Sequence, residues 1–391
     1  MSSDTAPAAG FPVGEFKGRT ERAQRLMAAD GLDAMLFTSE PEVRYFTGYL
    51  TRFWESPTRP WFLVVPARGK PIAVIPSIGA DLMSKTWLDD IRTWSAPDLE
   101  DDGVTLLAKT LCEVAGTAGR IGMPMGHETS LRMPLADYTR LCEAIAPRAM
   151  VDATAIVQAL HRVKSEREIA KIAHACTIAG KAFDNMAAIA RSGTPLTHVF
   201  RDFQVALLQA GADWVPYLAG GAGPGGYGDV ISLPSARPLQ TGDVLMLDTG
   251  AIHDGYFCDF DRNYAIGQAP DDSRRAYDTL YAATEAGLAA ARPGATCSEV
   301  FHAMNAVIAR FGGADAQAGR IGHGLGMRLT EWPSLIPADT TVLEPGMVMT
   351  LEPGLEMAPG RIMVHEENIV IREAGAQLLS PRAAPHLPVL D

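Results

Sequence analysis

The sequence predicts a two-domain protein with α and β structure in both parts, and three observations support this prediction. At 391 residues the chain is too long for one ordinary hydrophobic core. Strand-like and helix-like segments alternate through about residue 155, a pattern typical of an α/β domain. Beyond it, two apolar runs flanking Asp254-Gly255 predict a β-hairpin at the centre of a second domain. We place the domains at residues 15–158 and 159–391.

Composition argues against several classes of protein. The chain is 47% hydrophobic and 20% charged, as expected of a soluble globular protein. A net charge of −12, with no basic run, disfavours nucleic acid as a partner. No apolar stretch reaches the roughly 18 residues of a membrane span, and the polar start lacks a signal-peptide core. The five cysteines show no paired spacing. We therefore expect a cytoplasmic protein without a membrane partner.

The first domain is expected to follow a loose N-terminal tail of about 14 residues. Helical periodicity begins near Phe16 and stops at Gly31, as at a helix C-terminus. The segment Val43–Gly48 fits either a helical turn or a strand. Short apolar runs predict buried strands at Ala34–Phe37, Trp61–Pro66 and Pro71–Pro76.

A loop between these strands is dense in Trp and Arg. Its candidate functional residues are Arg52, Trp54, Arg59 and Trp61. One interpretation is a proline-fixed turn whose aromatic side chains cap the small domain. The other is a substrate lid, because Trp and Arg bind carboxylates and cations and loops often carry such contacts.

The second domain is expected to open with a long helical region, Val157–Ala190. A helix after residue 196 and a strand at Val215–Leu218 follow. The next segment, Gly220–Gly228, is rich in glycine but lacks the context of a phosphate-binding loop. Beyond the hairpin, helices are expected at Ser273–Arg292 and Cys297–Phe311.

The expected hairpin carries two acids among apolar residues. With a two-residue turn, Asp259 lies opposite Gly250 and diagonal to Asp248, so both carboxylates project from one face of the sheet. Carboxylates in such surroundings are costly to bury unless they are paired or bound to a metal. The hairpin therefore indicates a cation site whose other ligands lie downstream.

Three downstream positions are candidates for those ligands. His323 is flanked by glycines that let the backbone approach closely. Glu352 and Glu366 are each embedded in strand-like apolar sequence, the latter within Ile362–Ile371. By strand alternation His365 faces away from Glu366, and we interpret it as a non-ligand.

The candidate metal ligands are four carboxylates and one imidazole: Asp248, Asp259, His323, Glu352 and Glu366. Four negative charges match two divalent ions, and hard oxygen donors with one imidazole suit Mn²⁺, Zn²⁺, Co²⁺ or Fe²⁺. Two ions about 3.5–4 Å apart would lower the pKa of a water between them and polarise a substrate oxygen. The alternative is a set of separate surface or salt-bridged acids.

The order of these residues resembles the M24 metallopeptidase family, which has the pita-bread fold, in the branch of prolidase, Xaa-Pro aminopeptidase and creatinase. The shared order is an Asp, a second Asp eleven residues on, a Gly-His-Gly, a Glu-Pro-Gly and a last Glu. Gly31–Gly48, Val163–Ile169 and Gly242–Arg262 are also similar, so the resemblance covers nearly the whole chain. It implies a creatinase-like N-terminal α/β domain followed by a pita-bread catalytic domain of the α+β class.

The resemblance also implies site roles. It implies the five ligands above, with Glu352 as the general base and His323 also in the catalytic set. It further implies a homodimer, in which the N-terminal domain of one subunit helps to close the site of its partner.

Three positions depart from the family pattern. Where family peptidases have a second His seven residues after the first, this chain has Thr330. Where they have a His about eighteen residues ahead of the first ligand, Asp229 is the nearest polar residue. Losing one such stabiliser of the transition state typically costs about 10²–10³ in rate. Asp261 replaces a Thr, and we expect it to hydrogen-bond near the ligands and to pair with Arg262; the alternative is an extra metal ligand.

We therefore expect a dinuclear metal hydrolase that cleaves the C–N bond of a small substrate. That substrate is either an Xaa-Pro-type peptide or a small amide of the creatinase or ectoine-hydrolase kind. The alternatives are a lyase of the dimethylsulfoniopropionate-lyase type on the same fold and a non-catalytic pita-bread binding protein. The hypothesised substrate contacts are Arg52, Trp54, Arg59, Trp61, Asp229, Arg328, Thr330 and Trp332.

Overall fold

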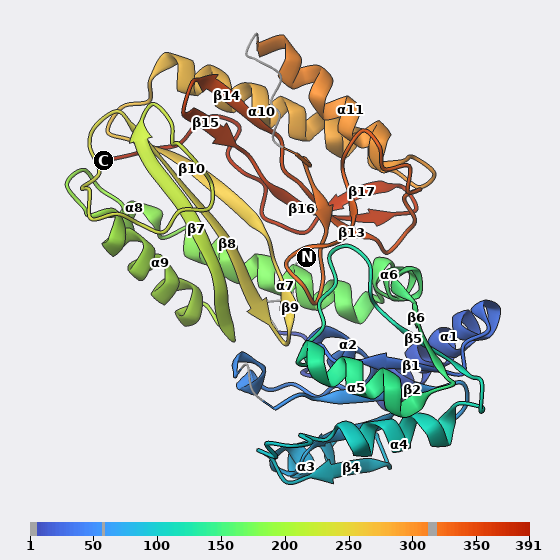
Figure 1. Ribbon diagram of the computed structural model, residues 1–391. Helices are drawn as coiled ribbons and strands as arrows, with labels where there is room; N and C mark the ends of the chain where they lie inside the picture. The colour runs from blue at the N-terminus through green and yellow to red at the C-terminus, as the bar shows by residue number, and fades with distance from the viewer. Residues whose placement is uncertain (1–5, 57–58, 312–318) are drawn as a thin grey trace. The chain divides into compact units, whose positions relative to one another are not determined.

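The computed structural model describes residues 6–56, 59–311 and 319–391, which form two compact units (Figure 1). The first comprises Ala8–His161 and the second Arg162–Asp391. The domain limits expected from the sequence, 15–158 and 159–391, stay a prediction. No helix in the described ranges is long and apolar enough to span a membrane.

The first unit is built on a mixed six-stranded sheet. Its strands lie in the order β4-β3-β2-β1-β5-β6, with β1 antiparallel to β2 and parallel to β5. Strands β1, β2 and β3 are buried on both faces, as their continuous apolar sequences predict. The strands are β1 (Ala34–Phe37), β2 (Phe62–Pro66), β3 (Ile72–Pro76), β4 (Ile91–Trp94), β5 (Arg120–Met123) and β6 (Ala149–Asp152).

Helices cover this sheet and largely follow the expected pattern. The first helix ends at Gly31, whose φ of 65° is the left-handed conformation that glycine adopts readily. This helix begins at Val13, so the predicted N-terminal tail, which runs to about residue 14, is slightly too long. Val43–Gly48, left open between helix and strand, is helical. The helices are α1 (Val13–Asp30), α2 (Glu40–Thr47), η1 (Arg52–Glu55), η2 (Ser77–Gly79), α3 (Ala80–Met83), α4 (Val104–Val114), α5 (Leu135–Ile145) and α6 (Thr154–Arg162).

The second unit contains two five-stranded sheets and a separate hairpin. In one sheet the order is β18-β10-β8-β7, with β9 paired to β8; in the other it is β12-β11-β13-β16-β17. Strands β14 and β15 form the hairpin. The strands are β7 (Trp214–Pro224), β8 (Asp243–His253), β9 (Tyr256–Phe257), β10 (Phe260–Ile266), β11 (His323–Gly324), β12 (Glu331–Ser334), β13 (Val348–Leu351), β14 (Gly354–Ala358), β15 (Arg361–Val364), β16 (Glu367–Arg372), β17 (Gly375–Leu378) and β18 (Val389–Leu390).

Helices pack on both sheets of this unit. Figure 1 shows α10 and α11 side by side, and their apolar faces join the two sheets in one core. Helices α7 and α9 pack against β8 and β7. Ser165 begins α7 with a capping box, in which its side chain and that of Glu168 satisfy each other's backbone N–H groups. The helices are α7 (Glu166–Phe183), α8 (Met186–Ile189), α9 (Leu196–Gln209), α10 (Asp271–Ala290), α11 (Cys297–Ile308) and η3 (Ala309–Phe311).

Three segments differ from the sequence prediction. The helical region Val157–Ala190 is broken after Arg162 and again after Phe183. The glycine-rich segment is mostly strand, because β7 continues to Pro224 and a Cβ at Gly220 would meet the β8 backbone. The expected single strand Ile362–Ile371 is two strands in different sheets, since β15 pairs with β14 and β16 with β13. The break in that segment falls at Glu366 and brings it to the junction of the sheets.

Candidate metal centre

The hairpin that carries two of the candidate ligands forms as predicted. Asp254 and Gly255 have φ values of 46° and 79°, which matches the two-residue type I′ turn favoured by Asp-Gly. One register continues from this turn along the paired strands. Extended to Asp259, that register places it opposite Gly250 and diagonal to Asp248.

All five candidate ligands converge in the structure. Asp259, His323 and Glu352 form one group, and Asp248, Asp259 and Glu366 form a second. In each group the ligand atoms, one from each residue, lie within 4.8 Å of one another. Asp259 belongs to both groups. Two overlapping groups of three ligands are what a pair of neighbouring ions requires.

The ligands come from both sheets of the second unit. Asp248 lies on β8 and Asp259 directly precedes β10, so these two acids belong to one sheet. His323 lies on β11, Glu352 directly follows β13, and Glu366 directly precedes β16 in the other sheet. The centre is therefore a junction between two sheets.

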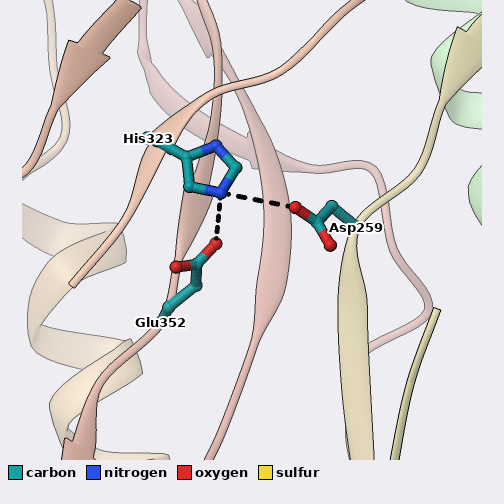
Figure 2. Close-up of side chains that lie close together, drawn as sticks. All are labelled: Asp259, His323 and Glu352. Carbon is teal, nitrogen blue, oxygen red and sulfur yellow. Dashed lines mark ion pairs between the residues drawn. The ribbon is translucent and has the colours of Figure 1, made fainter. Parts of the chain in front are cut away.

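His323 is oriented by its backbone neighbours. Its Nδ1 atom lies 2.8 Å from the carbonyl oxygen of Gly324, and its backbone N–H donates to Thr350 Oγ1 at 2.9 Å. Nε2 then faces the acids, 2.9 Å from Glu352 Oε1 and 3.3 Å from Asp259 Oδ2 (Figure 2). This orientation leaves Nε2 as the nitrogen available to a metal.

The acids of the second group are strongly perturbed. Burial raises the pKa of Asp248 well above its usual range, and the nearby carboxylates of Asp259 and Asp261 raise it further. Burial and Asp248 likewise raise the pKa of Glu366. Burial raises the pKa of Asp259 to about 6, although His323 opposes this change. Without a cation these carboxylates repel one another, which is what a site built for cations predicts.

His323 and Glu352 shift in opposite directions. Burial alone would lower the pKa of His323, but the adjacent carboxylates of Glu352 and Asp259 raise it well above its usual value. Burial alone would raise the pKa of Glu352, but His323 lowers it below its usual value. The two shifts have one cause, the electrostatic attraction between the imidazole and the carboxylate.

The surroundings of one carboxylate oxygen indicate whether these residues fit a metal. Asp248 Oδ1 is buried and has no hydrogen-bond partner among the residues that the structure describes. A buried acceptor without a donor is costly. A hard divalent cation would satisfy it, and the remaining oxygen and imidazole donors suit the same ions.

Asp261 lies beside the ligands but not in the expected pair. Its Oδ1 accepts the backbone N–H of Glu366 at 2.6 Å, and its Oδ2 accepts Asn263 Nδ2 at 2.7 Å. The expected pairing of its carboxylate with Arg262 is wrong. The Arg262 guanidinium donates to the backbone carbonyl oxygens of Asp261 at 2.6 Å and Glu366 at 2.9 Å, and to the Glu367 carboxylate at 3.1 Å.

His365 is turned away from the centre, as expected. Its Nδ1 lies 3.0 Å from Thr284 Oγ1, and burial lowers its pKa to about 3.

The Trp and Arg side chains of the first unit are mostly engaged within that unit. Trp54 and Trp61 are buried, with 8% and 1% of their surface exposed. Arg132 lies over the Trp54 ring at 5.0 Å and donates to the carbonyl oxygen of Arg59 at 3.3 Å. Arg52 is more exposed and pairs with Glu55. These contacts fit the capping interpretation, and a role of the loop as a lid stays a prediction.

The remaining substrate candidates of the second unit lie at Asp229 and in the segment that runs from the loop after His323 into β12. The exposed Asp229 carboxylate accepts the backbone N–H groups of Ile231 and Ser232 at 2.9 and 2.7 Å, so it shapes its own turn. Arg328, Thr330 and Trp332 follow His323 and are partly exposed. Their contact with substrate stays a prediction.

Buried Glu331 holds the loop after His323. Its Oε1 accepts the backbone N–H of Met327 at 2.9 Å, and its Oε2 is 2.9 Å from Lys164 Nζ. Lys164 is almost fully buried as well.

Sequence reasoning missed three polar residues around the ligands: Tyr217, Thr350 and Asn368. Tyr217 on β7 lies close to Asp248, Thr350 accepts the His323 N–H, and Asn368 bonds to the Asp259 backbone. Thr350 is two residues before Glu352, and Asn368 is two residues after Glu366. Strand alternation places such pairs on one face and could have indicated both.

Comparison with known families and proteins agrees with this architecture. The Creatinase/Prolidase N-terminal domain matches residues 19–163, and Metallopeptidase family M24 matches residues 170–373. The second match covers more than half of the chain. The protein belongs to the M24 metallopeptidase family.

Individual relatives extend this result. Probable dipeptidase PepE of Mycobacterium tuberculosis is 29% identical over 380 residues, covering 96% of each chain. The Xaa-Pro dipeptidase of Pyrococcus furiosus is 31% identical over 235 residues, covering 58% of this chain and 65% of the other. The crystal structure of dipeptidase PepE from Mycobacterium ulcerans has a TM-score of 0.84 at 27% identity, covering 97% of this chain and 99% of that one.

Several expectations are thereby confirmed. The chain has a creatinase-like N-terminal domain and a pita-bread catalytic domain, and it is a metal-dependent peptide hydrolase that uses divalent ions. The comparisons give no support to the lyase or to the non-catalytic binding protein.

Proposed function

We propose that this protein is a dinuclear metallodipeptidase that cleaves the C–N bond of short peptides, Xaa-Pro dipeptides among them. The observation that carries the dinuclear centre is the sharing of Asp259 by two groups of three ligand atoms. The dipeptide substrate is supported by relatives named dipeptidase and Xaa-Pro dipeptidase.

The proposed ligands are five: Asp248, Asp259, His323, Glu352 and Glu366. Two ions drawn from Mn²⁺, Zn²⁺, Co²⁺ and Fe²⁺ suit this donor set. When bound, the ions lower the pKa of a water and polarise the scissile carbonyl.

Glu352 is the proposed general base. Its carboxylate lies beside the other candidate ligands, where it can accept a proton from a water held there. It takes the proton from the attacking water and returns it to the leaving nitrogen. His323 completes the ligand set through Nε2, which lies 2.9 Å from Glu352 Oε1, so both residues would hold the same ion.

Substrate contacts are proposed in each unit, at the positions that the sequence singles out. The proposed contacts are Arg52, Trp54, Arg59, Trp61, Asp229, Arg328, Thr330 and Trp332. Asp229 and Trp61 are the weakest of these, since the Asp229 carboxylate already serves the turn at residues 229–232 and only 1% of the Trp61 surface is exposed. We also propose a homodimer in the cytoplasm. The family resemblance supports the dimer, and five free cysteines fit a reducing compartment.

A dipeptide panel tests the proposal. The chelated protein is reloaded with Mn²⁺, Zn²⁺, Co²⁺ or Fe²⁺ and assayed with Xaa-Pro and other dipeptides, with small cyclic and guanidino amides alongside. Hydrolysis of dipeptides that requires added metal is expected. A fully metallated protein that cleaves none of the dipeptides would refute the proposed substrate class.

A further inference from the structure

The two sheets that supply the ligands meet along β10 and β16. Strand β10 pairs with β8 and β18, and β16 pairs with β13 and β17, so each strand already has its backbone partners. The two strands nevertheless lie close together. Hydrogen bonds across this junction are made by side chains, and they concentrate on the backbone of two ligands, Asp259 and Glu366.

Asn368 holds the backbone of Asp259 from the opposite sheet. Its Oδ1 accepts the Asp259 N–H at 2.9 Å, and its Nδ2 donates to the Asp259 carbonyl oxygen. The side chain is fully buried. The Cys176 thiol donates to the side-chain Oδ1 of Asn368 at 3.2 Å and orients the amide. The backbone N–H of Asn368 donates to Ser380 Oγ at 3.0 Å. Both backbone groups of a ligand are thus satisfied by one fixed side chain.

Asp261 makes the reciprocal contact. It lies two residues after Asp259 and accepts the backbone N–H of Glu366 at 2.6 Å. Asn368 in turn lies two residues after Glu366. Each ligand is therefore held by the residue that lies two positions beyond the other ligand.

These contacts act on one of the two ligand groups more than on the other. The group with Asp248 contains both Asp259 and Glu366, so its geometry depends on the distance across the junction. Of the two ligands held across the junction, the group with Glu352 contains Asp259 but not Glu366. His323 in that group is held independently, through its contacts with Gly324 and Thr350.

We propose that Asp261 and Asn368 are positioning residues that set the separation of Asp259 and Glu366 and so determine the affinity of the ion bound by Asp248, Asp259 and Glu366. This inference rests on the proposed dinuclear centre. Residues that orient metal ligands typically change metal affinity by about 10–100-fold when they are replaced. Loss of either contact is expected to weaken this ion within that range and to weaken the other ion, which shares only Asp259, by less.

The test is a metal titration of the full-length chain. Chelated wild-type protein and the variants Asn368→Ala and Asp261→Ala are titrated with Co²⁺ by calorimetry. Visible absorption is recorded at each addition, because it reports the coordination geometry of each ion. The matched control is Tyr277→Phe, which removes a buried hydrogen bond of 2.7 Å to the Ala384 carbonyl in the same unit without touching a ligand.

The wild type and the control are each expected to bind two ions, and the affinity for each ion should be the same in both proteins. In both alanine variants one ion should weaken by about 10–100-fold, with a changed absorption spectrum. The milder variants Asn368→Ser and Asp261→Asn keep a neutral acceptor at each position and should show a smaller loss. They also preserve the test if an alanine variant does not fold.

Three outcomes separate the positioning role of Asp261 and Asn368 from the dinuclear centre on which it rests. Unchanged affinities in folded Asn368 and Asp261 variants would overturn the positioning role. Equal weakening of both ions, in these variants and in the Tyr277→Phe control alike, would also overturn it by showing a general loss of stability. A wild-type protein that binds fewer than two Co²⁺ ions would instead refute the dinuclear centre.

Discussion

Removing the metal should reverse the usual effect of pH on stability, and Asp259 allows the size of the effect to be worked out. In the metal-free chain burial raises the pKa of Asp259 from its ordinary 3.8 to about 6. The folded state then binds this proton more tightly than the unfolded state does. The stability contributed by the protonated carboxyl is present at low pH and is lost as pH rises from about 4 to about 6.

The magnitude follows from the difference between the two pKa values. Each pKa unit corresponds to 1.36 kcal/mol, so ionising Asp259 destabilises the metal-free protein by about 3 kcal/mol at pH 8. The pKa of Asp248 and that of Glu366 are raised in the same direction, chiefly by burial, and add to the effect. Bound divalent ions should remove this loss, because the carboxylates are then neutralised.

Urea unfolding of chelated protein at pH 4, 6 and 8 measures the effect. The free energy of unfolding should fall between pH 4 and pH 8 in the metal-free wild type, and added Mn²⁺ should restore it at pH 8. The variant Asp259→Asn should show a smaller fall, by roughly 2–3 kcal/mol. Equal stability of the metal-free wild type at pH 4 and pH 8, or no effect of Mn²⁺, would refute the description of these acids as a buried cation site.

Three substitutions test other parts of the account. Replacing Glu352 by Gln should lower kcat/KM by at least about 10²-fold, because no carboxylate remains to move the proton. Activity near the wild-type value would exclude Glu352 as the general base. The substitution Thr330→His should raise kcat/KM for Xaa-Pro dipeptides by up to about 10²-fold, because it supplies a hydrogen-bond donor for the transition state. If a variant with normal metal content shows no gain, this position does not reach the substrate. Breaking the buried pair of Lys164 and Glu331 with Lys164→Met should destabilise the protein by about 3–5 kcal/mol in urea unfolding. The double change Lys164→Met with Glu331→Gln removes the unpaired charge and keeps an acceptor for the Met327 N–H, so it should recover part of that loss. Destabilisation of the double variant as large as that of the single one would contradict the pairing.

The local features of the centre could be predicted from the sequence. The Asp-Gly turn sets the register of the hairpin, and the register places Asp248 and Asp259 on one face. Strand alternation was sufficient to exclude His365. Such predictions depend only on neighbours along the chain.

The missed features depend on contacts between distant segments. Asn368 meets Asp259 across 109 positions of sequence, so neither residue alone reveals the contact. The glycines of β7 indicate a loop by composition, yet Gly220 serves the close approach of β8. Arg262 follows Asp261 directly in the sequence, but its guanidinium bonds to the Asp261 backbone carbonyl and to the Glu367 carboxylate, not to the Asp261 side chain.

The metal content of the purified chain tests the central claim most directly. Elemental analysis after reloading with Mn²⁺ and gel filtration should give two ions per chain. Because Asp259 serves both ligand groups, Asp259→Ala should lose at least one of those ions. A wild-type chain without bound metal, or an Asp259→Ala variant that keeps two ions, would contradict the proposed centre.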